Sequence, residues 1–429
     1  MMFKKSMVSW SVAGALLAMS GAVAASGFAL IEQSASGLGN AYAGGAASAE
    51  DASTVFFNPA GMSRLSGKQI VVAGHAITPS AKFSDNGSTA ATVQTLGGTG
   101  GDAGGLAFVP NAYFVMEVNP AMRVGLGINA PFGLQTEYDS NWMGRFQAIK
   151  SKIETINLNP SVSYNVNEKF SVGAGLNYQH IKAELTSMKS LGAAGQGLST
   201  MSGSDDAWGY NLGALFSMGA NARIGIAYRS AISSQLSGDA FVSNPSVVVI
   251  PGTNVTIPIK ADLKTPDTLS LSYFRNLENS WDVMADLTHT GWSNFKELRV
   301  NQASSGSTIS LTPENWKDTW RISAGASHHY NEQWSARAGI AVDQSPVPDS
   351  SRTARIPDND RTWLSVGGQY KSTKSSAIDF GYAHLFVKDS SISNNTGSAG
   401  TPSTPSVGNL VGTYKNSVNI LSAQYTHSF

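Results

Sequence analysis

The chain has 429 residues, its 29 basic and 29 acidic side chains balance to a formal charge of zero, and it contains no cysteine. A neutral chain lacks the electrostatic footprint of a nucleic-acid-binding protein, and without cysteine it forms neither disulfides nor thiolate metal sites. Only 14% of the residues are charged, against about 25% in soluble domains. The length allows two or three soluble domains or one large all-β domain.

Residues 1–25 have the order of a secretory signal peptide. Lys4 and Lys5 precede an apolar stretch over about residues 7–19, and a run of small residues follows at 21–25. This stretch is shorter than the ~20 residues that a spanning helix needs, which argues against a membrane anchor. We expect cleavage after Ala25. The sequence beyond it contains no window of 18 apolar residues, so the exported protein is either soluble or a membrane β-barrel.

Residues 26–67 are rich in Gly, Ala and Ser and show no strand alternation. Such a segment is too poor in large apolar residues to form a core of its own. It is either a disordered periplasmic tail or a plug inside a barrel. The apolar side chains at 28, 30–31 and 55–57 need burial, which favours the plug.

From residue 68 onward the sequence alternates with period two. Over 156–166 every even position except Pro160 carries a larger apolar side chain, and every odd position is Asn or Ser, so one face suits hydrocarbon and the other water. Fourteen strands are predicted, at about 68–82, 109–118, 121–136, 153–166, 169–187, 207–218, 221–235, 261–275, 280–299, 317–330, 333–343, 361–371, 376–388 and 416–429. Short turns alternate with long loops, as in outer-membrane barrels, and the chain ends in Phe429. The predicted fold is all-β: an antiparallel transmembrane barrel, 68–429, with a hatch formed by 26–67.

Several motifs resemble one known family. Ser26-Gly27-Phe28, the run 36–44, Asn58-Pro59-Ala60-Gly61-Met62 and the late segments 345–348 and 356–365 are similar to those of FadL-type fatty acid transporters of the Gram-negative outer membrane. The family also includes TodX-like hydrocarbon channels. The resemblance implies a hatch-closed barrel of fourteen strands, a multi-pass outer-membrane location, and no cofactor or energy source of its own.

The resemblance also assigns gating residues. Phe28 matches the family residue that reaches into the ligand pocket, and Asn58, Pro59 and Ala60 match the hatch turn, which is otherwise an ordinary tight turn. Pro131-Phe132-Gly133 interrupts the third strand, since both Pro and an interior Gly disturb ladder pairing. Gly133 falls on the family's kink glycine, where the wall opens laterally.

Two lysines match family positions that contact the ligand carboxylate, Lys182 and Lys317. At the first the family usually has arginine, and lysine supplies a point charge instead of a fork. Strand parity places Lys182 on the outward face, so a snorkelling surface lysine is the alternative. Lys317 shares the parity of the lumen-side Arg321, which favours a lumen position for it.

The sequence therefore predicts passive, ligand-gated uptake of long-chain fatty acids by a monomer in contact with outer-membrane lipid and lipopolysaccharide. Uptake of aromatic or aliphatic hydrocarbons is the alternative, and it needs no cation. An enzyme is disfavoured because the seven histidines lack a recognisable nucleophile context. A general porin is disfavoured because the lumen is plugged. No nucleic-acid or metal ligand is expected.

Overall fold

A computed structural model describes residues 26–243, 255–277, 280–397 and 399–429. The predicted signal peptide lies outside these residues. In the part of the chain that is described, no helix is long and apolar enough to cross a membrane.

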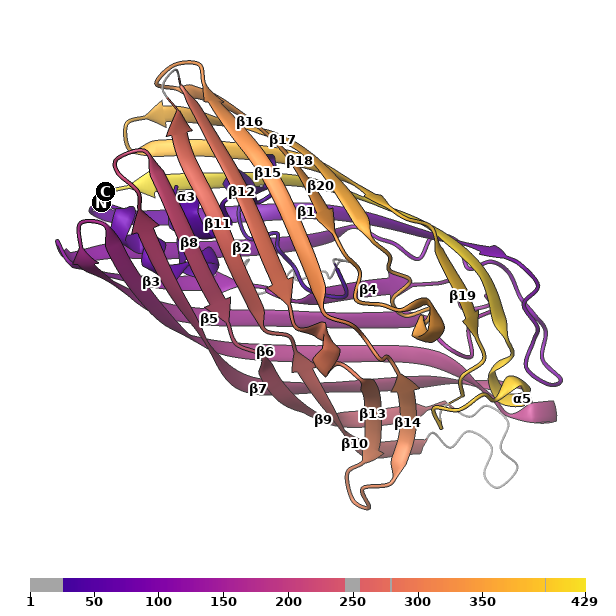
Figure 1. Cartoon of the computed structure of the whole chain (residues 1–429). Coiled ribbons are helices and arrows are strands. Elements are labelled where there is room, and N and C mark those ends of the chain that lie inside the picture. Colours follow the sequence, from indigo (N-terminus) through magenta and orange to yellow (C-terminus); the bar gives the residue numbers. More distant parts are fainter. Residues whose placement is uncertain (1–25, 244–254, 278–279, 398) are drawn as a thin grey trace, which may run out of the picture.

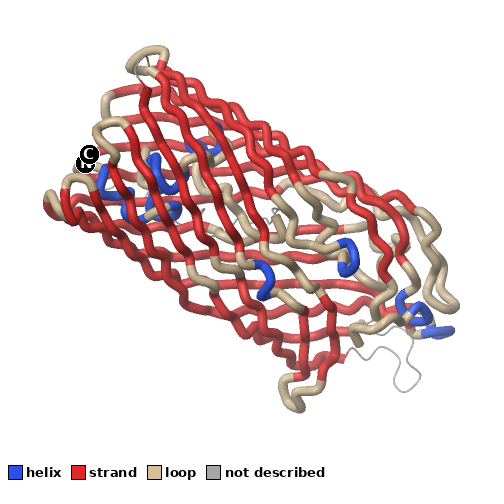
Figure 2. The backbone as a smooth tube through the Cα atoms, viewed as in Figure 1, coloured by secondary structure: helices blue, strands red, loops and turns tan. Residues whose placement is uncertain are grey.

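All strands belong to one antiparallel sheet that closes on itself (Figures 1 and 2). Closure is made by the first and last strands, which pair from Gln69↔Ser428 to Asp85↔Gly412. The strands are β1 (Lys68–Asp85), β2 (Ala107–Asn119), β3 (Met122–Asn129), β4 (Gly133–Glu137), β5 (Lys150–Asn167), β6 (Phe170–Ser190), β7 (Gln196–Ser217), β8 (Ala222–Arg229), β9 (Ile232–Val242), β10 (Val255–Thr265), β11 (Thr268–Leu277), β12 (Trp281–Thr290), β13 (Glu297–Gln302), β14 (Thr308–Pro313), β15 (Thr319–His329), β16 (Trp334–Asp343), β17 (Arg361–Thr373), β18 (Ser376–Val387), β19 (Ser390–Asn394) and β20 (Leu410–Ser428).

The 20 segments make a barrel of fourteen wall strands. The difference arises because six wall strands are each divided in two, for example the third into β3 and β4 and the seventh into β8 and β9. The predicted strand number and the closed all-β fold are confirmed. The short turns and the C-terminus lie at one end of the barrel, and the long loops around β19 and α5 (Thr404–Val407) lie at the other (Figure 1).

The alternation predicted from the sequence separates the two faces of the wall. On β5, Asn157 and Ser163 face inward and are buried, whereas Val162 and Tyr164 face outward and are exposed. Trp208 and Trp334 are likewise exposed on the outer surface, where aromatic side chains form the girdles of membrane barrels.

Residues 26–67 fold inside the barrel, where short helices lie against the inner wall (Figure 2). The helices are α2 (Ala35–Gly39), α3 (Gly45–Ser48), α4 (Thr54–Phe57) and the 3₁₀ helix η1 (Pro59–Arg64). Three further 3₁₀ turns lie in the loops, η2 (Gly192–Ala194), η3 (Trp292–Asn294) and η4 (Asp349–Ser351). We call residues 26–67 the hatch.

Wall glycines allow the hatch backbone to touch the barrel. A Cβ atom at Gly213 would overlap the Asn58 side chain, and one at Gly225 would overlap the Ala46 carbonyl oxygen. A Cβ atom at Gly325 would lie 2.8 Å from the Asn40 carbonyl oxygen. The glycines with such contacts, which we call the glycine seat, are Gly125, Gly173, Gly213, Gly225, Gly325, Gly339, Gly367 and Gly381.

Arginines of the wall fix the hatch further. Four wall arginines donate hydrogen bonds to backbone carbonyls of the hatch. The pairs are Arg123 with Leu65, Arg223 with Ala47 and Ser48, Arg229 with Phe56, and Arg321 with Ala41. A fifth, Arg337, pairs with Asp379 on the wall and Glu50 in the hatch. Charge-assisted bonds of this kind contribute about 1.5–3 kcal/mol each.

Candidate functional site

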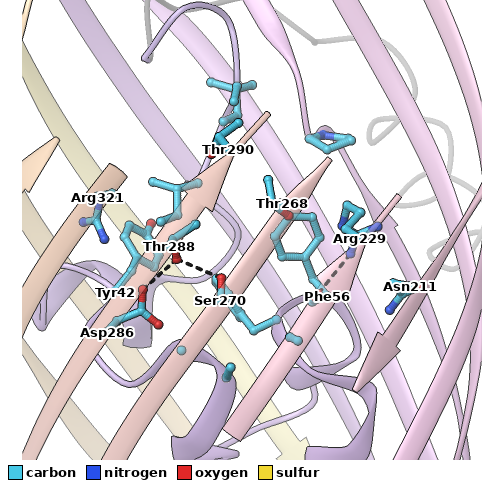
Figure 3. A pocket seen from close by; sticks show the side chains of 18 of the residues that line it. Tyr42, Phe56, Asn211, Arg229, Thr268, Ser270, Asp286, Thr288, Thr290 and Arg321 are labelled. Carbon is cyan, nitrogen blue, oxygen red and sulfur yellow. Dashed lines mark hydrogen bonds between the residues drawn. The ribbon is translucent and has the colours of Figure 1, made fainter. Parts of the chain in front are cut away.

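A cavity lies between the hatch and the wall, and we call it the chamber (Figure 3). Its apolar lining comes from both sides, with Ile31 and Phe57 from the hatch and Phe132, Trp292 and Trp363 from the wall region. An apolar lining of this kind suits an apolar ligand.

Phe28 packs beside the chamber in a cluster of aromatic side chains. Its ring is fully buried, and the ring centroids of Trp292, Trp316, Phe295 and Phe132 lie 4.7, 5.7, 5.9 and 6.0 Å away. Phe28 itself is not among the residues that line the chamber, but Phe132 and Trp292 are. A ligand that fills the chamber therefore touches the cluster that holds Phe28.

The predicted interruption of the third strand is present. β3 pairs with β5 as far as Asn129↔Asn157, and β4 resumes the ladder at Gly133↔Glu154, so residues 130–132 oppose only two residues of β5. On the other side, the pairing of β2 with β3 ends at Ala112↔Ile128. The wall is therefore broken beside residues 130–132, which we call the wall break.

The start of the hatch lies in the wall break, where Ala29 forms an isolated antiparallel bridge with Phe132. Leu30 N donates to the Pro131 carbonyl oxygen, and Gly133 N donates to the Phe28 carbonyl oxygen, both at 2.8 Å. Asn111 Nδ2 on β2 donates to the Glu32 carbonyl oxygen at 2.9 Å. Residues 26–33, which we call the latch, thus connect the two sides of the break.

Glu32 of the latch has a buried carboxyl group. Its Oε2 atom has no hydrogen-bond partner in the described part of the chain. Burial raises the pKa of Glu32 from 4.5 to about 7, against the attraction of Arg361 and Arg321. The ionised form is therefore destabilised while the latch is closed.

The turn Asn58-Pro59-Ala60 anchors the hatch to β7. Asn58 Nδ2 donates to the carbonyl oxygens of Ala46 at 2.7 Å and Ala214 at 3.0 Å, and Asn58 Oδ1 accepts from Ala60 N at 3.0 Å. Asn58 is completely buried, and Pro59 also lines the chamber. The turn contacts a wall strand that is not adjacent to the wall break.

The structure does not bring the two predicted lysines to the chamber. Lys182 lies on the outward face of β6 and is exposed, as its strand parity indicates. Lys317 precedes β15 instead of opening it and is also exposed, so the parity argument for a lumen position does not apply. Neither lysine lines the chamber.

The cations that do line the chamber are Arg229 and Arg321 (Figure 3). Arg229 lies 4.3 Å from the ring centroid of Phe56, and Arg321 lies 5.1 Å from the ring centroid of Trp363. No carboxylate of the described residues lies within ion-pair distance of either guanidinium. Both arginines donate hydrogen bonds to backbone carbonyls of the hatch, Arg229 to that of Phe56 and Arg321 to that of Ala41.

A second cavity lies among the long loops at the other end of the barrel. Its lining mixes apolar side chains, such as Leu185, Met188 and Met201, with the cations Lys189 and Arg355. Near it, burial raises the pKa of Glu314 to about 8. We call this cavity the outer cavity. In the ranges that the structure covers, no cluster of three His, Cys, Asp or Glu side chains could hold a metal ion.

A closed transmembrane barrel with an internal hatch and an apolar chamber defines the class as an outer-membrane transport protein. The family model for outer membrane protein transport proteins of the OMPP1/FadL/TodX type matches residues 16–429, and the chain belongs to this family. It is an outer-membrane protein of the Gram-negative type. The family resemblance predicted from the motifs is confirmed.

Individual relatives are similar to this chain over most of its length. The chain is 31% identical over 408 residues to the long-chain fatty acid transport protein of Escherichia coli O6:H1 (strain CFT073), which covers 87% of this chain and 90% of that one. It is 32% identical over 413 residues to outer membrane protein P1 of Haemophilus influenzae (Rd), with 87% and 89% covered.

Solved structures show the same fold. The crystal structure of a Pseudomonas aeruginosa FadL homologue has a TM-score of 0.84 and 26% identity, and the match covers 94% of this chain and 99% of that one. The Pseudomonas putida toluene transporter TodX gives a TM-score of 0.69 at 18% identity, with the same coverage.

Proposed function

We propose that this protein takes up long-chain fatty acids across the outer membrane by passive diffusion. The observation that carries the proposal is the chamber, where an apolar lining meets Arg229 and Arg321. The chamber is also lined by Asp286 and Asp343, but no described carboxylate lies within ion-pair distance of either guanidinium. A fatty acid supplies both the apolar chain and a carboxylate that can pair with these arginines. Relatives at 31% identity are named long-chain fatty acid transport proteins. The family consists of transport channels, and we propose that this monomer has no catalytic role and no cofactor.

The proposed route begins at the outer cavity. Met188 and Met201 offer apolar surface there, and Lys189 offers a cation. From the outer cavity the acid moves to the chamber, where its carboxylate meets Arg229 and Arg321 and its chain packs on the aromatic lining.

The exit is proposed to be lateral, at the wall break. The cavity on the opposite side of the hatch is lined by charged groups, among them Glu50, Asp51, Arg64 and Arg223. An acyl chain in this cavity would place apolar surface among charged and hydrated groups, which is less favourable than its transfer into the hydrocarbon of the membrane. The break at residues 130–132 offers an apolar path into the membrane.

The latch is the proposed gate. Release of Phe28 from its cluster removes the carbonyl oxygen that accepts from Gly133 N, so the latch and the kink at Gly133 open together. Asn58, Pro59 and Ala60 hold the body of the hatch in place during this movement.

The alternative cargo is a neutral hydrocarbon, which carries no charged group that could pair with the chamber arginines. Uptake of labelled oleate and toluene should be compared in cells that lack their own transporter, with verified expression of each variant. We expect Arg229→Gln with Arg321→Gln to reduce oleate uptake at least tenfold, because a charge-assisted bond contributes about 1.5–3 kcal/mol. Lys182→Gln and Lys317→Gln are the matched controls and should retain oleate uptake.

Normal oleate uptake by the double arginine variant would contradict the proposal. A loss of uptake on Lys317→Gln alone would support the original prediction from the family motif. Toluene uptake without oleate uptake by the unchanged protein would assign it to hydrocarbon transport.

A further inference from the structure

Six buried carboxamide side chains cover the inner wall between the wall break and the chamber. They come from four neighbouring strands and are at most 2% exposed. The set is Asn129 on β3, Asn157 and Asn159 on β5, Asn177 and Gln179 on β6, and Asn211 on β7.

Three of these side chains form a continuous chain of hydrogen bonds that ends at a chamber cation. Asn157 Nδ2 donates to Asn129 Oδ1 at 3.1 Å and to Asn177 Oδ1 at 3.0 Å. Arg229 Nη1 donates to the same Asn177 oxygen. We call Asn129, Asn157 and Asn177 the carboxamide relay. It runs from the last paired residue before the wall break to Arg229.

The relay is only partly satisfied in the closed barrel. Asn129 Nδ2 and Asn157 Oδ1 are buried without a hydrogen-bond partner among the described residues. Each such group carries a desolvation cost of about 1–3 kcal/mol. These costs offset the favourable hydrogen bonds of the relay, so the network stabilises the closed arrangement only weakly. Free donors and acceptors also allow the same amides to re-pair in a second arrangement, which a switching element requires.

We propose that Arg229 and the carboxamide relay couple an anionic head group in the chamber to opening of the wall break. The inference rests on the proposed function and adds a positioning role to the relay. A carboxylate that binds Arg229 takes Nη1 away from Asn177, because the charged acceptor is the stronger one. Asn157 Nδ2 is then the remaining relay donor to Asn177 Oδ1. Its bond to Asn177 strengthens at the expense of its bond to Asn129, and Asn129 loses its anchor beside residue 130. The carboxylate therefore binds the open arrangement more tightly, which is the condition for a ligand to shift the equilibrium.

This coupling makes the gate selective for charge. A hydrocarbon can fill the same apolar lining but leaves the bond between Arg229 and Asn177 intact. The chamber would admit both kinds of cargo, and the relay would open the wall only for the anionic one.

The chain has no cysteine, so one introduced thiol can report on the wall break. Ala130 is buried at 6% exposure, and Ala130→Cys in vesicles is reacted with a lipid-soluble maleimide, with and without oleate. We expect oleate to raise the labelling rate about tenfold and toluene to leave it unchanged. Asn157→Leu in the same background should abolish the oleate effect, while oleate affinity, measured by calorimetry, stays within twofold.

Gln179→Leu is the matched control, because Gln179 is a buried carboxamide at the same level with no bond to the relay. It should keep the oleate effect. Asn157→Ser, too short to bridge both neighbours, replaces Asn157→Leu if the latter does not fold. The relay would be overturned if oleate still raised the labelling rate in both Asn157→Leu and Asn157→Ser. It would also be overturned if toluene raised the labelling rate of Ala130→Cys as much as oleate does, or if oleate bound to Ala130→Cys without changing its labelling rate. Failure of oleate to bind the unchanged chain would instead overturn the proposed function.

Discussion

Replacement of Gly213 by alanine tests whether contact with the wall holds the hatch in place. The added methyl group would overlap Asn58 Oδ1 and lie 3.0 Å from Pro59 Cδ. Gly213 does not have a positive φ, so alanine is compatible with the strand backbone, and the effect comes from the overlap alone. The Asn58 side chain must then move from its buried position.

Movement of Asn58 breaks the three hydrogen bonds of its side chain, with Ala46, Ala60 and Ala214. At about 0.5–1.5 kcal/mol for each bond, the docked hatch loses roughly 2–4 kcal/mol. A change of 1.4 kcal/mol is tenfold in an equilibrium constant, so the undocked population rises by a factor of about 30 or more.

Single-channel recording in planar bilayers measures this population as the fraction of time spent conducting. Gly105→Ala is the control, because the nearest atom to its new methyl group, Gln135 Nε2, is 3.9 Å away. A folded Gly213→Ala barrel that conducts no more often than the control would refute the reasoning. If the overlap with Asn58 is the cause, Gly213→Ala should add little to the conductance of Asn58→Gly.

Phe28→Ala should accelerate hydrogen exchange of the Gly133 amide, which donates to residue 28, because loss of the buried ring costs the closed latch about 3–5 kcal/mol. Because the pKa of Glu32 is raised to about 7, the closed latch is most stable below pH ~4.5 and loses stability as pH rises through 7. The same exchange rate should therefore increase between about pH 4.5 and 7 beyond its intrinsic pH dependence, and Glu32→Gln should remove that excess. Arg337→Met should lower the melting temperature because the buried Asp379 loses its ion-pair partner and keeps only the hydrogen bond from Gln369. The added change Asp379→Leu should restore most of the melting temperature.

The fold follows from the sequence because strand alternation and the turns are local signals. Over 156–166 the alternating side chains define both faces of a strand without knowledge of its neighbours. The break at Pro131 was predictable for the same reason, since proline cannot donate to a ladder. The parity of Lys182 was also sufficient to place it on the outer face.

The chamber cations depend on long-range contacts that the sequence does not encode locally. Arg321 and Asp343 face the same cavity, yet Arg321 binds the carbonyl oxygen of Ala41, 280 residues away in sequence. Arg229 binds that of Phe56, 173 residues away. Lys317 lies in the connection before β15, so strand parity does not govern its direction. Periodicity predicts the face of a side chain in a regular strand, but not its partner across a lumen.

The glycine seat has a consequence for how the wall sequence can change. At each of these positions a side chain as small as a methyl group would lie 3.2 Å or less from a hatch atom, so glycine is retained there although it is a weak strand former. The packing of residues 26–67 is therefore written into the wall strands as a set of glycines.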